Sequence, residues 1–142
     1  MVLKRHTFEI IDHTADLGIM VAGTNLKELF QNASHAMMRI MLKQGPGETG
    51  EPTHISVQGS DLPDLMVRWL GEILYLFEGE NRLVTQTKIL EITPNHLDAQ
   101  IKTIPFSLDR HEILTEIKAV TYHQIEVIRK GELWTARIIF DL

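Results

Sequence analysis

The chain of 142 residues carries a formal net charge of −5 with neutral histidines and contains no cysteine. The absence of cysteine excludes disulfides, thiolate zinc sites and cysteine nucleophiles, and it is typical of proteins from a reducing cytoplasm. The negative charge argues against a primary nucleic-acid binder, because such proteins need surplus lysine and arginine to displace the counterions around phosphate.

The first third of the chain predicts two short strands followed by an amphipathic helix. Residues 7–11 are rich in β-branched and aromatic types, residues 17–22 form a second apolar run, and residues 12–16 between them are polar. Asn25, followed three residues later by Glu28, is typical of a capping box. Apolar residues then recur at spacings of three and four, which predicts a helix up to about residue 42.

The middle of the chain predicts a loop, a short strand and a second helix. Residues 45–52 are rich in glycine and proline and predict a flexible loop. This loop lacks the Lys-Ser/Thr pair and the helix start of a phosphate-binding loop. Ile55 and Val57 indicate a short strand. Asp61 is a candidate helix cap, Pro63 suits the first helical turn, and residues 79–81 should end the helix.

The last third predicts strands only. Residues 88–92 predict a strand, and residues 97–103 predict another through their alternation of apolar and polar types. Residues 116–128 predict one long strand, and residues 130–132 predict a turn before a final strand over residues 133–140. In the long strand His123 shares a face with Ile125 and Val127, so we expect it to be partly buried and hydrogen-bonded. Asp141 shares a face with Ile139, opposite Phe140.

Two helices among about seven strands, without regular βαβ alternation, predict an α+β fold: a sandwich of a mostly antiparallel sheet with two amphipathic helices. No repeat or linker divides the chain, so we expect a single domain over residues 1–142. The N-terminus lacks the apolar core of a signal peptide, and no apolar run approaches the roughly 20 residues that span a bilayer. We therefore expect a cytoplasmic protein without membrane contact.

Two acidic residues near opposite ends of the chain are the strongest candidate site. If the terminal strands pair, Asp16 and Asp141 become neighbours, and Asp12 or an oxygen of Leu142 adds a further ligand. Oxygen clusters of this kind suit Ca²⁺, Mg²⁺ or Mn²⁺. Spacing alone favours a plainer interpretation, in which Asp16 is a turn residue and Asp141 an exposed strand end.

Other polar residues are weaker candidates. His13 beside Asp12 has the composition of a general base with an orienting acid, although a structural histidine in a polar turn fits the sequence better. Lys118 and Glu116 form either an exposed ion pair or a polar patch for a partner. The seven histidines show no HxH or HExxH spacing, which argues against a histidine zinc site.

Three motifs, in this order, resemble those of the archease family. They are DHTAD at residues 12–16, EIKAVTYH at residues 116–123 and IIFDL at residues 138–142. The resemblance covers essentially the whole chain and depends on three motifs at family-like spacing. It implies a single archease-like domain of α+β type.

The resemblance also implies a function. Archeases assist the GTP-dependent RNA ligase of the RtcB type in tRNA splicing and RNA repair, where they promote guanylylation of the ligase and its multiple turnover. The implied role is therefore that of an activator and not of an enzyme. The implied partner is the ligase, with no strong direct binding to nucleic acid and no membrane.

The family's metal site falls on Asp16, Asp141 and Leu142, which reverses the preference that spacing alone gave. The implied cofactor is a divalent cation, calcium in a crystal, with magnesium or manganese as alternatives. Asp12, His13 and Lys118 are additional candidates for the site or for partner contact. A general chaperone or assembly modulator of nucleic-acid-processing proteins is the competing function. A metal-dependent hydrolase is weaker, because no nucleophile or acid–base pair accompanies the oxygen cluster.

Overall fold

The computed structural model describes residues 8–11, 16–43 and 49–142. These residues form two helices and ten strands, and every strand pairing among them is antiparallel. The elements are β1 (Phe8–Ile11), β2 (Asp16–Gly23), α1 (Leu26–Met41), β3 (Leu42–Lys43), β4 (Glu51–Gln58), α2 (Leu62–Glu80), β5 (Arg82–Thr93), β6 (His96–Pro105), β7 (Glu112–Ile113), β8 (Ala119–Val120), β9 (Glu126–Lys130) and β10 (Leu133–Asp141).

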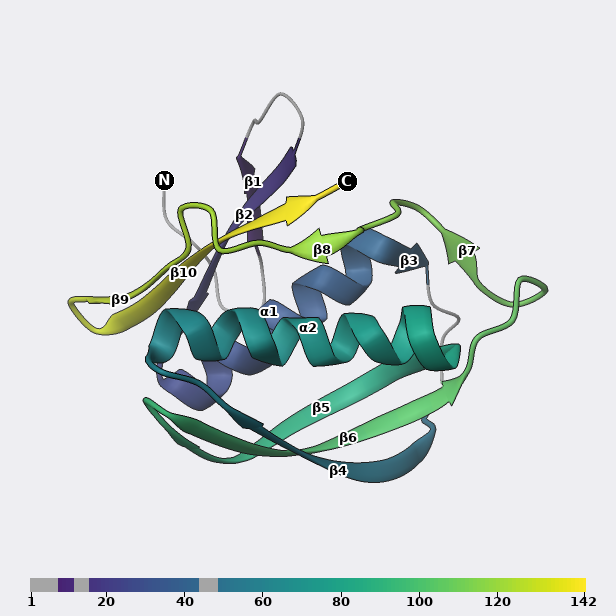
Figure 1. Ribbon diagram of the computed structural model, residues 1–142, viewed down its shortest axis with the longest axis horizontal. Coiled ribbons are helices and arrows are strands. Elements are labelled where there is room, and N and C mark those ends of the chain that lie inside the picture. Colours follow the sequence, from purple (N-terminus) through teal and green to yellow (C-terminus); the bar gives the residue numbers. More distant parts are fainter. Residues whose placement is uncertain (1–7, 12–15, 44–48) are drawn as a thin grey trace.

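The two helices lie between two antiparallel sheets (Figure 1). One sheet has the order β1-β2-β10-β8, with β9 also paired to β10, and the other has the order β4-β6-β5. A short β3-β7 ladder pairs the segment that follows α1 with the segment between β6 and β8. The predicted α+β class with antiparallel pairing is confirmed, but the strands divide among separate sheets because each large sheet packs one face on the helix layer.

The hydrophobic core lies between the helices and the inner faces of both sheets. Ile19 and Val21 of β2, Ile138 of β10 and Trp69 of α2 are fully buried in one continuous cluster. The indole N–H of Trp69 donates a hydrogen bond to the carbonyl of Phe30 at 2.9 Å, so the largest buried side chain leaves no polar atom unpaired. No helix in the described part of the chain is both long and apolar enough to cross a membrane.

Both helices begin where the sequence predicts. The side chain of Asn25 accepts from the Glu28 N–H at 2.9 Å, and the Glu28 carboxylate accepts from the Thr24 N–H at 3.0 Å. Asp61 caps α2 by accepting from the Asp64 N–H. The helix ends at Asn81, which adopts a left-handed conformation with φ of 53°. Local side-chain chemistry therefore determines three of the four helix ends.

The prediction of one long strand over residues 116–128 is wrong. Only Ala119–Val120 forms β8, and β9 begins at Glu126. Gln124 between them has φ of 52°, a conformation that a continuous strand does not contain. His123 is exposed, contrary to prediction, because it lies in this turn.

Three smaller boundaries also differ. Residues 51–52, predicted as loop, belong to β4, and β5 begins at Arg82, six residues before the predicted start. No pattern in the sequence predicts β7. The predicted turn after β9 is confirmed, with Gly131 at φ of 63°. Residues 45–48 of the predicted glycine-rich loop lie outside the described residues.

Candidate metal site at the ends of two central strands

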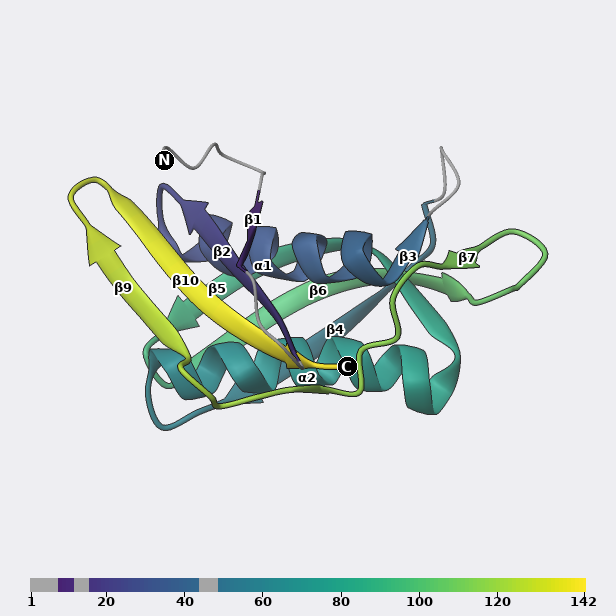
Figure 2. The same ribbon diagram turned by 90° about the horizontal axis from the view of Figure 1, so that it is seen from above.

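Asp16 and Asp141 lie directly opposite each other in the sheet. Asp16 is the first residue of β2, Asp141 is the last residue of β10, and the antiparallel register pairs them. Both views of the ribbon place the end of β10 beside the start of β2 (Figures 1 and 2). Directly opposed residues of antiparallel strands have Cα atoms about 4.5–5.5 Å apart and side chains on the same face. The fold therefore brings together two acids from near opposite ends of the chain.

This pair lies on the face of the sheet that points away from the core. Strand alternation places Ile19 and Val21 of β2, and Ile138 and Phe140 of β10, on the inner face, where all four are fully buried. Residues one position out of phase, including both acids, project to the other side. Asp16 is partly exposed and Asp141 is exposed, so an ion or a partner can reach both carboxylates from solvent.

The main chain around Asp141 is held by the opposite strand. The N–H of Lys118 donates to the carbonyl of Asp141 at 2.8 Å, and β8 pairs Ala119 with Asp141. The hydroxyl of Thr121 donates to the carbonyl of Ile139 at 2.9 Å. The Asp141 carbonyl accepts this hydrogen bond with one of its two lone pairs, and the main-chain oxygen of Leu142 is the further candidate ligand. Leu142 is exposed.

The electrostatics of the pair favour a cation. In the described part of the chain, neither Asp16 nor Asp141 forms an ion pair with a lysine, arginine or histidine. Two carboxylates held by register on one face repel each other, and a cation between them removes that repulsion. Hard divalent cations prefer carboxylate and main-chain oxygens, which are the donors present here.

The described side chains alone do not complete a metal site. Among residues 8–11, 16–43 and 49–142, no group of three or more histidine, aspartate or glutamate side chains gathers closely enough to hold an ion. Asp12 and His13 lie outside the described residues. Lys118 reaches the site through its main-chain N–H, and its side chain is exposed. A cation here would therefore use two carboxylates, the Leu142 oxygen and ligands such as water.

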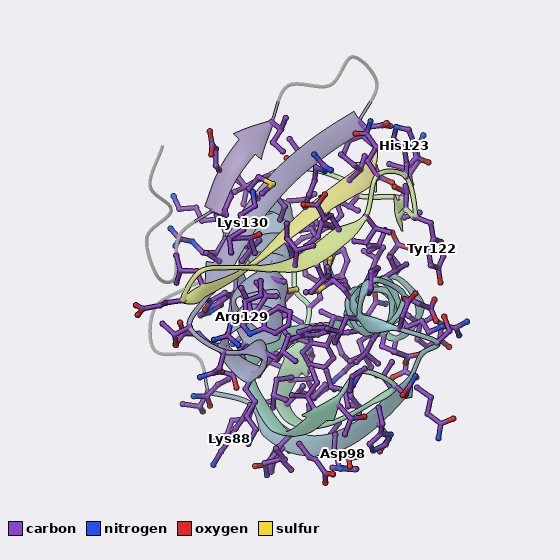
Figure 3. The ribbon with its side chains drawn as sticks, turned by 90° about the vertical axis from the view of Figure 1, so that its left-hand side faces the viewer. Lys88, Asp98, Tyr122, His123, Arg129 and Lys130 are labelled. Carbon is purple, nitrogen blue, oxygen red and sulfur yellow. The ribbon has the colours of Figure 1, made fainter. Side chains whose placement is uncertain are left out.

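Sequence reasoning missed a polar cluster beside this site. The hydroxyl of Tyr122 donates to the carboxylate of Asp64 at 2.6 Å, and the Nε of Arg68 donates to both oxygens of the same carboxylate, at 3.1 and 3.0 Å. Asp64 also accepts from the Ser60 N–H at 2.8 Å. Figure 3 shows Tyr122 and His123 along the same side of the molecule. The cluster fastens the turn after β8 to the first turn of α2.

The hydrogen bonds of this cluster shift the pKa of its members. The bond from Tyr122, followed by the one from Ser60, lowers the pKa of Asp64 far below its ordinary value of 3.8. The same bond to Asp64 raises the pKa of the Tyr122 hydroxyl, and the Asp64 carboxylate raises the pKa of Arg68. Tyr122 and Asp64 are 58 residues apart, so no local pattern in the sequence indicates the contact.

A second polar cluster lies on the outer face of the β4-β6-β5 sheet, away from Tyr122 and His123 (Figure 3). Asp98 accepts hydrogen bonds from the hydroxyl of Ser56 and from Nε2 of His96, the latter at 2.8 Å, and Nε2 of His54 lies 3.5 Å away. These contacts, that of Ser56 above all, lower the pKa of Asp98. Because Ser56 bonds to the carboxylate and not to a histidine, the arrangement is not a nucleophile–base pair.

Comparison with known proteins shows which family the chain resembles. The family model described as Archease protein family (MTH1598/TM1083) matches residues 8–142. A protein archease from Methanosarcina acetivorans is 34% identical over 141 residues, covering 95% of each chain. A protein archease from Thermoplasma volcanium is 36% identical over 138 residues, covering 96% of this chain and 99% of its own.

Two solved structures have the same fold. The solution structure of Methanobacterium thermoautotrophicum protein 1598 superposes with a TM-score of 0.78 at 31% identity, over 96% of this chain and 99% of that chain. The crystal structure from Thermotoga maritima, described as an archease and possible chaperone, gives a TM-score of 0.66 at 21% identity, over 98% of this chain and 100% of that chain. The second similarity concerns the fold alone.

Proposed function

This chain belongs to the archease family, and from that premise we propose that it is a protein activator of an RtcB-type RNA ligase and not an enzyme itself. In this role it promotes guanylylation of the ligase and its multiple turnover during tRNA splicing or RNA repair. The observation that carries the proposal is the direct opposition of Asp16 and Asp141 on an accessible face of the sheet.

Asp16, Asp141 and the main-chain oxygen of Leu142 would hold a divalent cation, with calcium, magnesium and manganese as candidates. A bound cation supplies positive charge that favours transfer of a phosphoryl group. The residues of this chain would hold the cation in position. β8 fixes the main chain of Asp141 through Lys118, and the β2-β10 register fixes the spacing of the two carboxylates.

The position of the acids suits contact with a partner. They lie at the rim of the sheet, where Ala119 of β8 pairs with Asp141 and the exposed side chain of Lys118 precedes it in the chain. Binding of this surface to a ligase conformation that is ready for guanylylation would shift the ligase toward that conformation. Lys118 would then contribute partner contact through its exposed ammonium group, and not a metal ligand.

A multiple-turnover ligation assay tests the proposal, with purified cognate ligase in limiting amount. Asp16→Asn and Asp141→Asn, singly and together, should remove stimulation while the circular dichroism spectrum stays that of the wild type. Asp109→Asn removes an exposed carboxylate elsewhere and serves as the matched control. Full stimulation by the folded double variant would refute the metal-site role.

A chaperone-like activity is the second candidate, and one observation favours it. The segment before β8 exposes three large apolar side chains, with 75% of Leu108, 47% of Ile113 and 53% of Leu114 accessible. The Thermotoga structure is also described as a possible chaperone. If this function is correct, wild-type protein suppresses aggregation of unrelated proteins without metal, and Leu108→Ser with Leu114→Ser abolishes the effect while Asp16→Asn does not.

A further inference from the structure

The outer face of the β4-β6-β5 sheet carries two lysines, Lys88 and Lys102, that pair with no carboxylate in the described part of the chain. Lys88 of β5 is opposite Gln100 of β6, and Lys102 of β6 is opposite Gln86 of β5. Lys88 is exposed, and Figure 3 shows it projecting outward from this sheet. The register holds the two lysines on one face at diagonal positions, where backbones lie about 7–8 Å apart.

These four side chains frame a depression of about 230 Å³. Its lining offers two ammonium groups and two amides, all of which can donate hydrogen bonds to an oxyanion. Two cations fixed by register repel each other, and an anion between them relieves the repulsion. A phosphate group fits such donors, because its oxygens accept several hydrogen bonds at once.

A second, neutral pocket shares the lining residue Gln86 with this depression. It has a volume of about 380 Å³, within the range of about 300–1,000 Å³ for small-molecule sites. Its lining combines residues of α1 and β5 with Thr49, two residues before β4. Every lining side chain has a hydrogen-bonding group: Gln31, Asn32, His35, Thr49, Thr85, Gln86 and Thr87.

Several lining groups of the neutral pocket are already held in place. The Gln31 carbonyl oxygen accepts from the Ile89 N–H at 2.9 Å, which fixes the orientation of its amide. The Thr87 and Ser34 hydroxyls lie 3.0 Å apart, within hydrogen-bonding distance. Asn32 donates to the Ala22 carbonyl at 2.8 Å. A pocket with oriented amides and hydroxyls, and no carboxylate among its described lining residues, is suited to the hydroxyls of a sugar.

We propose that the two hollows form one site for a phosphorylated ribose, with the phosphate at Lys88 and Lys102 and the sugar in the neutral pocket. The source is either a free nucleotide or a terminal nucleotide of RNA, which share this chemistry. The site lies on the sheet that does not contain Asp16 and Asp141, so the proposal is independent of the activator function.

Nuclear magnetic resonance titrations of the ¹⁵N-labelled protein test the site with four probes: inorganic phosphate, adenosine, AMP and a short RNA with or without a 5′-phosphate. AMP should shift the amide signals of both hollows and bind more tightly than phosphate or adenosine. Lys88→Gln with Lys102→Gln should weaken AMP binding about tenfold and remove most of its salt dependence. A lower dissociation constant for the 5′-phosphorylated RNA than for AMP identifies an RNA end as the source, and the reverse identifies a free nucleotide.

Two control variants make the outcome decisive. Lys130→Gln removes one positive charge from β9, away from both hollows, and should leave AMP binding unaltered. Gln86→Ala, at the point shared by both hollows, should weaken AMP more than inorganic phosphate. The proposal is overturned if millimolar AMP shifts no signal, if Lys130→Gln weakens binding as much as the Lys88/Lys102 double variant, or if phosphate binds as tightly as AMP.

Discussion

The hydroxyl of Tyr122 lies 2.6 Å from the carboxylate of Asp64 and joins the turn after β8 to the N-terminus of α2. Because β8 also holds the main chain at Asp141, this bond supports the rim on which the candidate metal site lies. Tyr122 is 56% exposed, so its aromatic ring contributes little to the core, and the hydroxyl is the part of the side chain that is fixed.

Tyr122→Phe should therefore loosen the turn without altering the fold. The variant keeps the ring and loses one hydrogen bond, so we expect faster amide hydrogen exchange at residues 121–125 and only a small fall in the thermal midpoint. Tyr75→Phe, which alters another exposed tyrosine with no hydrogen bond of its hydroxyl among the described residues, is the matched control. Unchanged exchange at residues 121–125 would show that the bond does not hold the turn.

The acid stability of the protein should depend on Asp64. Its pKa in the folded state lies below the ordinary value of 3.8, so the folded protein binds this proton less readily than the unfolded chain. The stabilisation is complete above pH 3.8 and is lost as the pH falls toward the folded-state pKa. Asp98, whose pKa is also lowered, contributes with the same sign.

Urea unfolding as a function of pH measures this contribution. Asp64→Asn should flatten the fall in unfolding free energy below about pH 4, relative to wild type, and reduce stability at pH 7. Asp109→Asn, at an exposed position, should leave the wild-type slope. A wild-type slope in Asp64→Asn would mean that other carboxylates account for acid unfolding.

Two glycines should respond oppositely to alanine. A Cβ on Gly23 would come within 2.5 Å of the main-chain nitrogen of Leu29, so β2 and α1 would have to separate. We expect Gly23→Ala to destabilise the protein by about 1–3 kcal/mol. At Gly71, inside α2, a Cβ meets nothing within 4 Å, and Gly71→Ala should stabilise the protein by about 0.5–1 kcal/mol. Urea unfolding of both variants checks the pair, and equal effects would contradict the close approach of β2 and α1.

The sequence was sufficient for those features that depend on near neighbours. Asn25 and Asp61 cap their helices with bonds to residues three positions along, which a single sequence displays. The phase of alternation in β10 placed Asp141 on the face of Ile139 and away from the core. The expected pairing of the strands that carry Asp16 and Asp141 is confirmed.

Features that depend on contacts between residues far apart in the sequence could not be predicted in this way. The chain turns at Gln124 without a glycine or proline, and residues distant in the sequence contact it there: Tyr122 donates to Asp64, and Arg137 donates to the Gln124 carbonyl. Apolar residues alternate on both sides of that turn, so the sequence pattern resembles that of one continuous strand. The division of the strands into two sheets likewise follows from packing on the helix layer, which no local pattern records.

The last prediction concerns metal binding at Asp16 and Asp141. A ligand that binds only the folded state stabilises it by RT ln(1 + [L]/Kd), about 2.7 kcal/mol at a concentration 100 times the Kd. Calcium, magnesium or manganese should therefore raise the thermal midpoint of the wild-type protein, and a chelator should reverse the rise. In Asp16→Asn with Asp141→Asn the metal-dependent rise should disappear, while the midpoint without metal should stay equal or increase, because like-charge repulsion is removed. Asp109→Asn should retain the full response. A rise of equal size in the double variant would place the ion elsewhere, whereas a fall in its metal-free midpoint would indicate that the two carboxylates stabilise the fold through contacts other than a shared cation.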